Sequence, residues 1–206
     1  MEQQNKIIGV VGRKGSGKST MAHRILQRIP RLFVFDTMGE HGFVPNTCRD
    51  LGEAEEFLAW AEMQDTFAGR LIPDDDIEAD FTVVARWVYE QGEMLFAIEE
   101  IPLLCRPGFL PPELGQLVRL GRHRDLSLLW TAQRAAEVSR TLTAMTDIFI
   151  LFSSTEPRDL DAIADRCGTE IADKVSCLPL HGFLVWDVIA RQEFNGHDLN
   201  SLAVLR

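Results

Sequence analysis

The sequence has little of what marks a secreted or membrane-spanning protein. Its four cysteines, Cys48, Cys105, Cys167 and Cys177, lie far apart and form no CxxC pair. This spacing argues against a zinc site or a disulfide framework and favours a reducing compartment. No apolar run is long enough to cross a bilayer, and no secretory signal is visible at the amino terminus. We therefore expect a cytoplasmic protein without a membrane span.

The sequence is also short of positive charge. It has 21 lysines and arginines against 31 aspartates and glutamates, which gives a formal net charge of −10. A surface of that sign repels phosphates, which argues against non-specific coating of nucleic acid but does not exclude a local basic channel. With 206 residues, 46% of them hydrophobic, we expect one domain over residues 1–206.

Short apolar runs alternate with longer segments of helical periodicity. This alternation is typical of an α/β fold with a mostly parallel sheet. Strands are expected at 7–11, 32–35, 66–72, 94–98, 126–131, 148–152 and 183–189. Helices are expected at 18–28, 52–63, 77–90, a segment ending near 121, 137–145, 159–167 and 170–176.

One segment carries a complete phosphate-binding motif. Residues 12–19 match GxxxxGK[ST] at every constrained position, between an apolar strand and a helix. Glycines let backbone N–H groups surround phosphate oxygens, and the helix adds the positive end of its dipole. The motif predicts that ATP binds through Gly12, Arg13, Lys14, Gly15, Ser16, Gly17, Lys18, Ser19 and Thr20. Lys18 should bridge the β- and γ-phosphates, Ser19 should ligate Mg²⁺, and Thr20 should lie near the α-phosphate.

Two glutamates follow the predicted strand at 94–98. Glu99 and Glu100 stand at the carboxyl edge of the sheet, where ligands bind in open α/β folds. Neighbouring strand residues point to opposite faces, so the two carboxylates can take different tasks. We assign Glu99 to the magnesium shell and Glu100 to the attacking water. Because this motif normally begins with aspartate, Asp36 is an alternative metal ligand.

A further polar pair brackets the predicted strand at 126–131. Gln133, at the strand end, can contact the γ-phosphate and report its loss on hydrolysis. Arg122 precedes the strand and so lies toward the opposite edge, too far to serve its own nucleotide easily. It could instead stabilise transition-state charge in a neighbouring subunit, and Arg124 is the competing candidate.

These residues resemble a known family. Residues 122–134, which end in Thr-Ala-Gln-Arg, resemble the FtsK–HerA superfamily of ring-forming DNA-pumping ATPases. Residues 32–40, with their D-x-x-G-E pattern, are similar to HerA-like members. Residues 147–160 and 183–188 resemble the minimal viral genome-packaging ATPases. The resemblance spans nearly the whole chain and is weakest over residues 46–80.

The resemblance implies Arg122 as an arginine finger acting in trans and Gln133 as a sensor. It further implies a P-loop ATPase fold, a homo-oligomeric ring of five or six subunits, and double-stranded DNA and viral capsid proteins as partners. The loop 104–110, with Arg106 and Phe109, could follow DNA phosphates or be an ordinary surface loop.

Other functions stay open at this point. A HerA-like or conjugation-type DNA pump is the nearest alternative, and a nucleotide-dependent switch is another. A small-molecule P-loop kinase shares the glycine-rich loop, but no arginine-rich lid segment is present to close over a second substrate.

Overall fold

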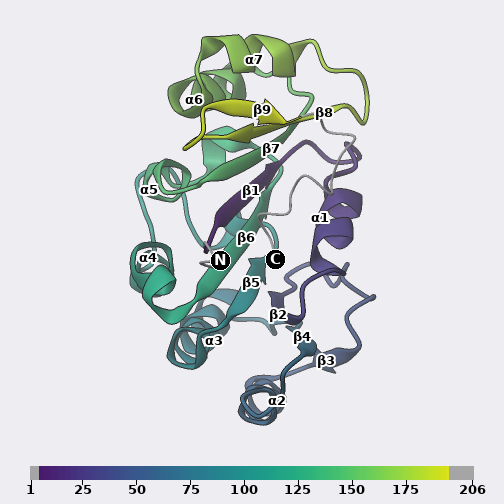
Figure 1. Cartoon of the computed structure of the whole chain (residues 1–206), viewed down its shortest axis with the longest axis vertical. Coiled ribbons are helices and arrows are strands. Elements are labelled where there is room, and N and C mark those ends of the chain that lie inside the picture. The colour runs from purple at the N-terminus through teal and green to yellow at the C-terminus, as the bar shows by residue number, and fades with distance from the viewer. Residues whose placement is uncertain (1–4, 195–206) are drawn as a thin grey trace.

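Strand β1 (Ile7–Val11), which leads into the phosphate-binding loop, lies inside a nine-stranded sheet with the order β3-β4-β2-β5-β6-β1-β7-β8-β9. The computed structural model describes residues 5–194. The strands from β3 to β7 are parallel, whereas β8 and β9 are antiparallel to their neighbours (Figure 1). The prediction of a mostly parallel sheet flanked by helices is confirmed.

The strand bounds follow the apolar runs of the sequence. The remaining strands are β2 (Arg31–Phe35), β3 (Asn46–Cys48), β4 (Phe67–Leu71), β5 (Met94–Ile98), β6 (Leu126–Ala132), β7 (Ile148–Phe152), β8 (Phe183–Asp187) and β9 (Gln192–Phe194). β5 and β7 are buried at every position, as expected for central strands covered on both faces.

Helices cover both faces of the sheet, but unequally. They are α1 (Lys18–Leu26), α2 (Leu51–Ala61), α3 (Ile77–Gln91), α4 (Pro112–Leu120), α5 (Arg140–Ala144), α6 (Pro157–Cys167) and α7 (Thr169–Ser176). Helices α2 to α7 pack on one face and contribute to the larger hydrophobic cluster. Helix α1 packs on the other face, where it buries Met21, Ile25 and Leu26 (Figure 1).

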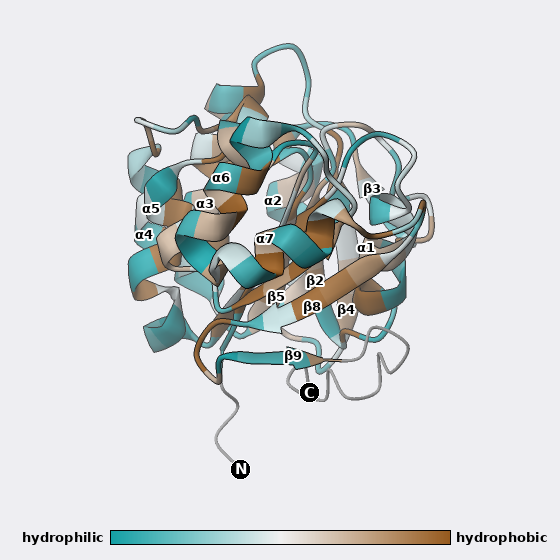
Figure 2. Cartoon of the chain, turned by 90° about the horizontal axis from the view of Figure 1, so that it is seen from above, coloured by the Kyte–Doolittle hydropathy of each residue, from teal (hydrophilic) through white to brown (hydrophobic). Residues whose placement is uncertain are grey.

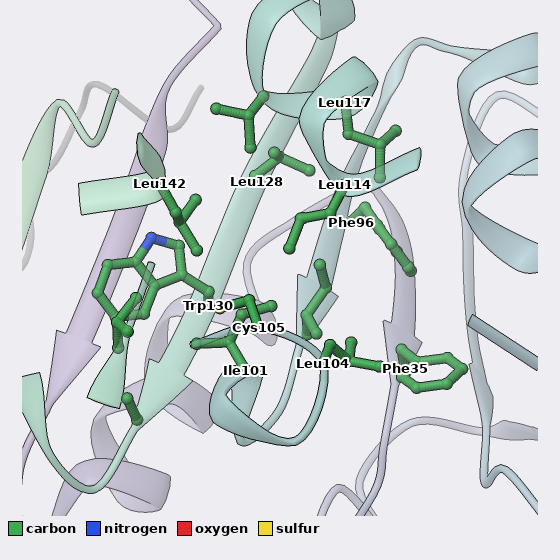
Figure 3. Packing of buried hydrophobic residues seen from close by; sticks show 14 of the residues in the cluster. Phe35, Phe96, Ile101, Leu104, Cys105, Leu114, Leu117, Leu128, Trp130 and Leu142 are labelled. Atoms are coloured by element: carbon green, nitrogen blue, oxygen red, sulfur yellow. The ribbon is translucent and has the colours of Figure 1, made fainter. Parts of the chain in front are cut away.

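The larger cluster contains Trp130, which is 1% exposed, between β6 and the helices (Figure 3). Its indole Nε1–H donates to Thr146 Oγ1 at 3.1 Å, so the buried polar atom is satisfied. A Cβ on Gly9 would lie 2.3 Å from the indole ring. Glycine on β1 is therefore what lets a tryptophan fill this layer.

The alternation of side chains along β2 and β5 determines where the acidic residues point. Leu32 and Val34 face α1, as do Leu95 and Ala97 on the neighbouring strand. Continuing this alternation places Asp36 and Glu99 on the same α1 face, side by side at the carboxyl edge.

The structure differs from the predicted elements at three places. β3 and β9 were not predicted, because each is a short polar edge strand defined by its pairing (Figure 2). The predicted helix at 137–145 is wrong over its first three residues, because Ala135–Glu137 is a 3-10 turn, Val138 is extended and α5 begins only at Arg140. Asp159 of α6 accepts the Ala136 N–H at 3.0 Å, and this tertiary contact fixes the non-helical path.

Candidate nucleotide-binding and hydrolysis site

The loop between β1 and α1 has the shape that phosphate binding needs. Gly15 and Gly17 have φ of 78° and 101°, a left-handed conformation that glycine adopts without strain. A Cβ on Gly12 would lie 2.5 Å from Ser16 Oγ, so a side chain there would fill the loop. Ser16 Oγ is buried and has no hydrogen-bond partner among the described residues. An unsatisfied buried hydroxyl in this loop is consistent with a polar ligand.

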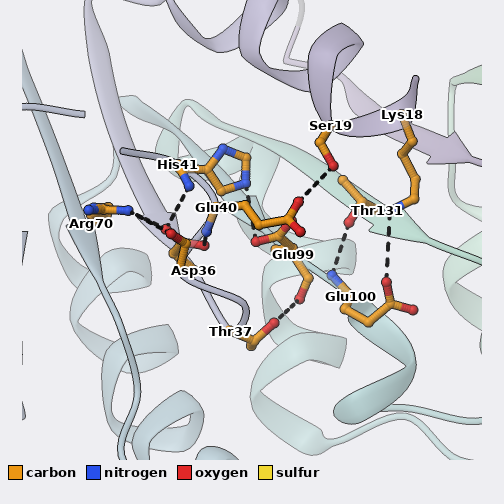
Figure 4. Close-up of polar contacts among 11 residues, drawn as sticks. Lys18, Ser19, Asp36, Thr37, Glu40, His41, Arg70, Glu99, Glu100 and Thr131 are labelled. Carbon is orange, nitrogen blue, oxygen red and sulfur yellow. Dashed lines mark hydrogen bonds and ion pairs between the residues drawn. The ribbon is translucent and has the colours of Figure 1, made fainter. Parts of the chain in front are cut away.

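Lys18 and Glu100 meet at the mouth of this loop. Lys18 Nζ lies 3.8 Å from Glu100 Oε2, and both side chains are nearly buried, at 10% and 12% exposed (Figure 4). Glu100 has φ of 49°, a left-handed conformation that costs a non-glycine residue roughly 1–3 kcal/mol. Its N–H donates to Thr131 Oγ1 at 2.9 Å, and its Oε1 accepts the Gln133 N–H at 3.3 Å. These bonds hold Glu100 toward the loop, the direction expected of a residue that orients water.

Glu99 points the other way. Its side chain is 4% exposed, and its Oε2 lies 3.4 Å from His41 Nε2 (Figure 4). Burial, with Asp36 adding to it and His41 opposing it, raises the pKa of Glu99 above its ordinary value. The two glutamates are thus divided between two environments, as the strand alternation predicts. The assignment of Glu99 to the magnesium shell stays a prediction.

Asp36 makes most of the hydrogen bonds in the buried network around Glu99. It is 0% exposed and binds Arg70 Nη1 at 2.7 Å through Oδ2. Its carboxylate also accepts the N–H groups of Glu40 and His41, each at 3.0 Å. Burial would raise the pKa of Asp36, but the hydrogen bonds from Glu99, His41 and Arg70 lower it. Ligand atoms of Asp36, His41 and Glu99 lie within 4.8 Å of one another, yet the Arg70 guanidinium opposes a cation there. We interpret the cluster as a structural network.

Ser19 has an acidic partner that the motif did not assign. Its Oγ donates to Glu40 Oε2 at 2.9 Å (Figure 4). A hydroxyl and a carboxylate in contact offer the hard oxygen donors that Mg²⁺ prefers. The residues present therefore fit a magnesium ion beside the phosphate-binding loop.

Gln133 lies where the sequence predicts, at the end of β6. With Gly12, Arg13 and residues 153–156 it lines a cavity of about 230 Å³ beside the phosphate-binding loop. The neighbouring Arg134 binds Glu156 at 2.7 Å and Asp159 at 3.4 Å. This arginine therefore ties the β6 end to the loop that follows β7.

Arg122 and Arg124 lie at the opposite end of β6, on a 3-10 turn spanning Gly121–Arg124. The Arg124 guanidinium hydrogen-bonds the backbone carbonyls of Tyr89 and Glu90 in α3. No residue within 5–194 accepts a hydrogen bond from the Arg122 guanidinium, which is exposed. β6 is 7 residues long, so Arg122 and Gln133 are separated by about 23 Å of strand.

Comparison with known proteins adds a strong structural likeness. The genome-packaging NTPase B204 of Sulfolobus turreted icosahedral virus 2, solved with ATPγS, matches with a TM-score of 0.75 and 21% identity over 94% of this chain and 97% of that one. The same NTPase with AMPPCP matches with a TM-score of 0.73 and 20% identity over 92% and 96%. The DNA-packaging ATPase B204 of Sulfolobus turreted icosahedral virus matches with a TM-score of 0.70 and 20% identity over 92% and 95%.

This chain has the fold of a viral genome-packaging NTPase. The resemblance to minimal packaging ATPases is confirmed at the level of fold. No protein-family model matches the sequence. No curated protein matches it either.

Several contributors to the site were not predicted from the sequence, His41 among them. Glu40 lies in the D-x-x-G-E pattern and Thr131 at the end of a predicted strand, but neither pattern gives the residue a role in the site. Arg70 lies on β4, where nothing in its sequence neighbourhood marks it as a partner of Asp36. His181 Nδ1 lies 3.2 Å from the Ser16 carbonyl oxygen, across 165 residues of sequence. Only the assembled sheet edge brings these residues together.

Proposed function

We propose that this protein is an ATP-hydrolysing DNA translocase, most specifically a viral genome-packaging motor that acts as a homo-oligomeric ring of five or six subunits. The observation that carries the proposal is the Lys18–Glu100 pair at 3.8 Å, at the mouth of a complete phosphate-binding loop. The packaging-NTPase fold extends over 94% of the chain and supports the more specific assignment.

The chain's own residues divide the chemistry of hydrolysis. Loop amides and Lys18 bind the phosphates, and Glu100 accepts hydrogen bonds from the attacking water and orients it. Gln133 senses the γ-phosphate, and its N–H already holds Glu100 at 3.3 Å. Mg²⁺, held through Ser19 and the nearby acids, would neutralise charge that develops on the phosphates.

A ring explains the position of Arg122. About 23 Å of strand separates Arg122 from its own site. Its guanidinium, which has no hydrogen-bond partner within residues 5–194, is suited to a neighbour's nucleotide. Arg124 is the weaker candidate, because α3 already engages its guanidinium.

DNA contact is assigned to the loop 104–110. Arg106 and Phe109 exchange backbone hydrogen bonds of 3.1 and 2.8 Å, and the Arg106 guanidinium lies 5.4 Å from the Phe109 ring centroid. Phe109 is 44% exposed. A cation and an aromatic ring presented together suit a nucleic-acid backbone and its bases.

Capsid proteins as partners and a location in the host cytoplasm belong to the same proposal. Within residues 5–194, no helix combines the length and apolar content of a membrane span.

ATPase activity with and without double-stranded DNA, paired with mass measurement in solution, tests the proposal. We expect DNA to stimulate hydrolysis and the mass to correspond to a ring. Lys18→Ala should abolish nucleotide binding, whereas Lys174→Ala, on the exposed surface of α7, should not. Turnover that requires an added metabolite acceptor would indicate a small-molecule kinase instead. Full activity of Lys18→Ala would refute the site itself.

A further inference from the structure

The contact between Ser19 and Glu40 joins two segments that are distant in sequence. Ser19 follows the loop lysine, and its hydroxyl is the group that this motif offers to Mg²⁺. Glu40 lies on the turn after β2, is exposed to solvent, and receives the Ser19 hydroxyl hydrogen bond at 2.9 Å (Figure 4).

The two oxygens lie at hydrogen-bond distance, which is close enough for a single Mg²⁺ ion to contact both. Mg²⁺ holds octahedral oxygen ligands at about 2.0–2.1 Å, so neighbouring ligand oxygens lie about 2.9 Å apart. Ser19 Oγ and Glu40 Oε2 are already 2.9 Å apart. We propose that the Glu40 carboxylate is the protein's acidic magnesium ligand, adjacent to the Ser19 hydroxyl in the coordination shell. This inference rests on the proposed ATP-dependent function.

Glu99 is less suited to that task than its sequence position indicates. Its side chain is 4% exposed, and its Oε2 faces His41 Nε2 at 3.4 Å on the α1 side of the sheet. Binding a solvated cation there would require the carboxylate to leave a buried network. Glu40 needs no such rearrangement, because it already contacts the hydroxyl and is open to solvent.

Asp36 is the positioning residue for Glu40. Its Oδ1 accepts the Glu40 N–H and its Oδ2 accepts the His41 N–H, each at 3.0 Å. Arg70 fixes the Asp36 carboxylate from β4 at 2.7 Å. Gly39, with φ of 68°, lets the chain turn between them. The D-x-x-G-E pattern thus folds into a turn that holds the Glu40 carboxylate beside the phosphate-binding loop.

The affinity for ATPγS, measured in EDTA and in Mg²⁺, tests the proposal. Mg²⁺ should raise the affinity of the unmodified protein. In Glu40→Gln that increase should fall by about 10- to 100-fold, while the affinity in EDTA stays unchanged. Glu40→Asp should recover part of the increase, and Glu55→Gln, an exposed change on α2, should behave as the unmodified protein.

A second readout uses Mn²⁺ in place of Mg²⁺. Paramagnetic resonance of free Mn²⁺, with ATPγS present, should show weaker metal binding to Glu40→Gln than to Glu55→Gln. An unchanged Mg²⁺ effect in Glu40→Gln, or its loss in Glu99→Gln alone, would overturn the inference and leave the ATPase proposal standing. No ATPγS binding by the unmodified protein would overturn both.

Discussion

Replacing Asp36 by asparagine tests the network that supports the site. The substitution keeps the size of the side chain but replaces one carboxylate oxygen with an NH₂ group. Asp36 accepts hydrogen bonds from the Glu40 N–H, the His41 N–H and the Arg70 guanidinium. At least one of these donors would then face another donor, and the Arg70 charge would lose its partner.

The magnitude follows from burial. Asp36 is 0% exposed and the Arg70 side chain 12% exposed, so water can replace little of what is lost. Removing one partner of a buried ion pair costs about 3–5 kcal/mol. That is a large part of the roughly 5–15 kcal/mol that stabilises a typical protein. For a chain of this size the melting temperature should fall by about 6–20 °C.

Urea unfolding of the two proteins measures the effect, with the midpoint compared at an unchanged slope. Asp65→Asn, an exposed change of the same chemistry, should shift the unfolding free energy by less than about 0.5 kcal/mol. In a double-mutant cycle, Arg70→Met should recover part of the loss caused by Asp36→Asn. A loss below about 1 kcal/mol for Asp36→Asn would show that the carboxylate does not hold this network together.

Two further predictions concern the glutamates and the trans arginine. Glu99 has a raised pKa in the folded state, so its contribution to stability is present below the unfolded pKa of about 4.5 and is lost as pH rises through the folded pKa. Glu99→Gln has a side chain that is neutral at every pH. Its free energy of unfolding in urea, relative to that of the unmodified protein, should therefore be higher at about pH 8 than at about pH 4. An equal loss at both pH values would contradict this prediction. Glu100→Gln should bind ATP without turnover, and Arg122→Ala should also lose turnover. Mixing the two variants should restore part of the hydrolysis, because one subunit then supplies the arginine and the other the base; no activity at any mixing ratio would count against catalysis across an interface.

The central strands could be predicted closely from the sequence. Residues 7–11, 94–98 and 148–152 are strands with the predicted bounds, because a continuous apolar run buried on both faces needs no information from its neighbours. The edge strands β3 and β9 could not be predicted in this way. Each has three residues, and pairing with an adjacent strand, rather than its own composition, defines it.

The candidate site was predicted in part for a similar reason. Local motifs pointed to Lys18, Ser19 and Glu100 from the order of strand, loop and helix, and the folded chain brings Lys18 Nζ to 3.8 Å from Glu100 Oε2. The role of Glu40 depends on a contact across 21 residues that only the folded turn creates. Glu100 also adopts a left-handed conformation with φ of 49°, which no residue-type pattern would predict for glutamate.

Strand β6 connects the candidate hydrolysis site to Arg122. At its carboxyl end, Thr131 Oγ1 and the Gln133 N–H both hold Glu100 against Lys18. An incoming phosphate would take Lys18 as its counter-ion and release Glu100 toward water, so nucleotide loading and exposure of the base are one event. Gln133 holds Glu100 through its backbone N–H, so a movement of the strand end toward the γ-phosphate would alter this hydrogen bond. Arg122 lies at the other end of the same hydrogen-bonded strand. A shift of β6 at this subunit's nucleotide would therefore also move Arg122, the residue proposed to act on the neighbouring subunit's nucleotide. In the ring proposed above, such a connection within one subunit would couple its own nucleotide site to that of its neighbour.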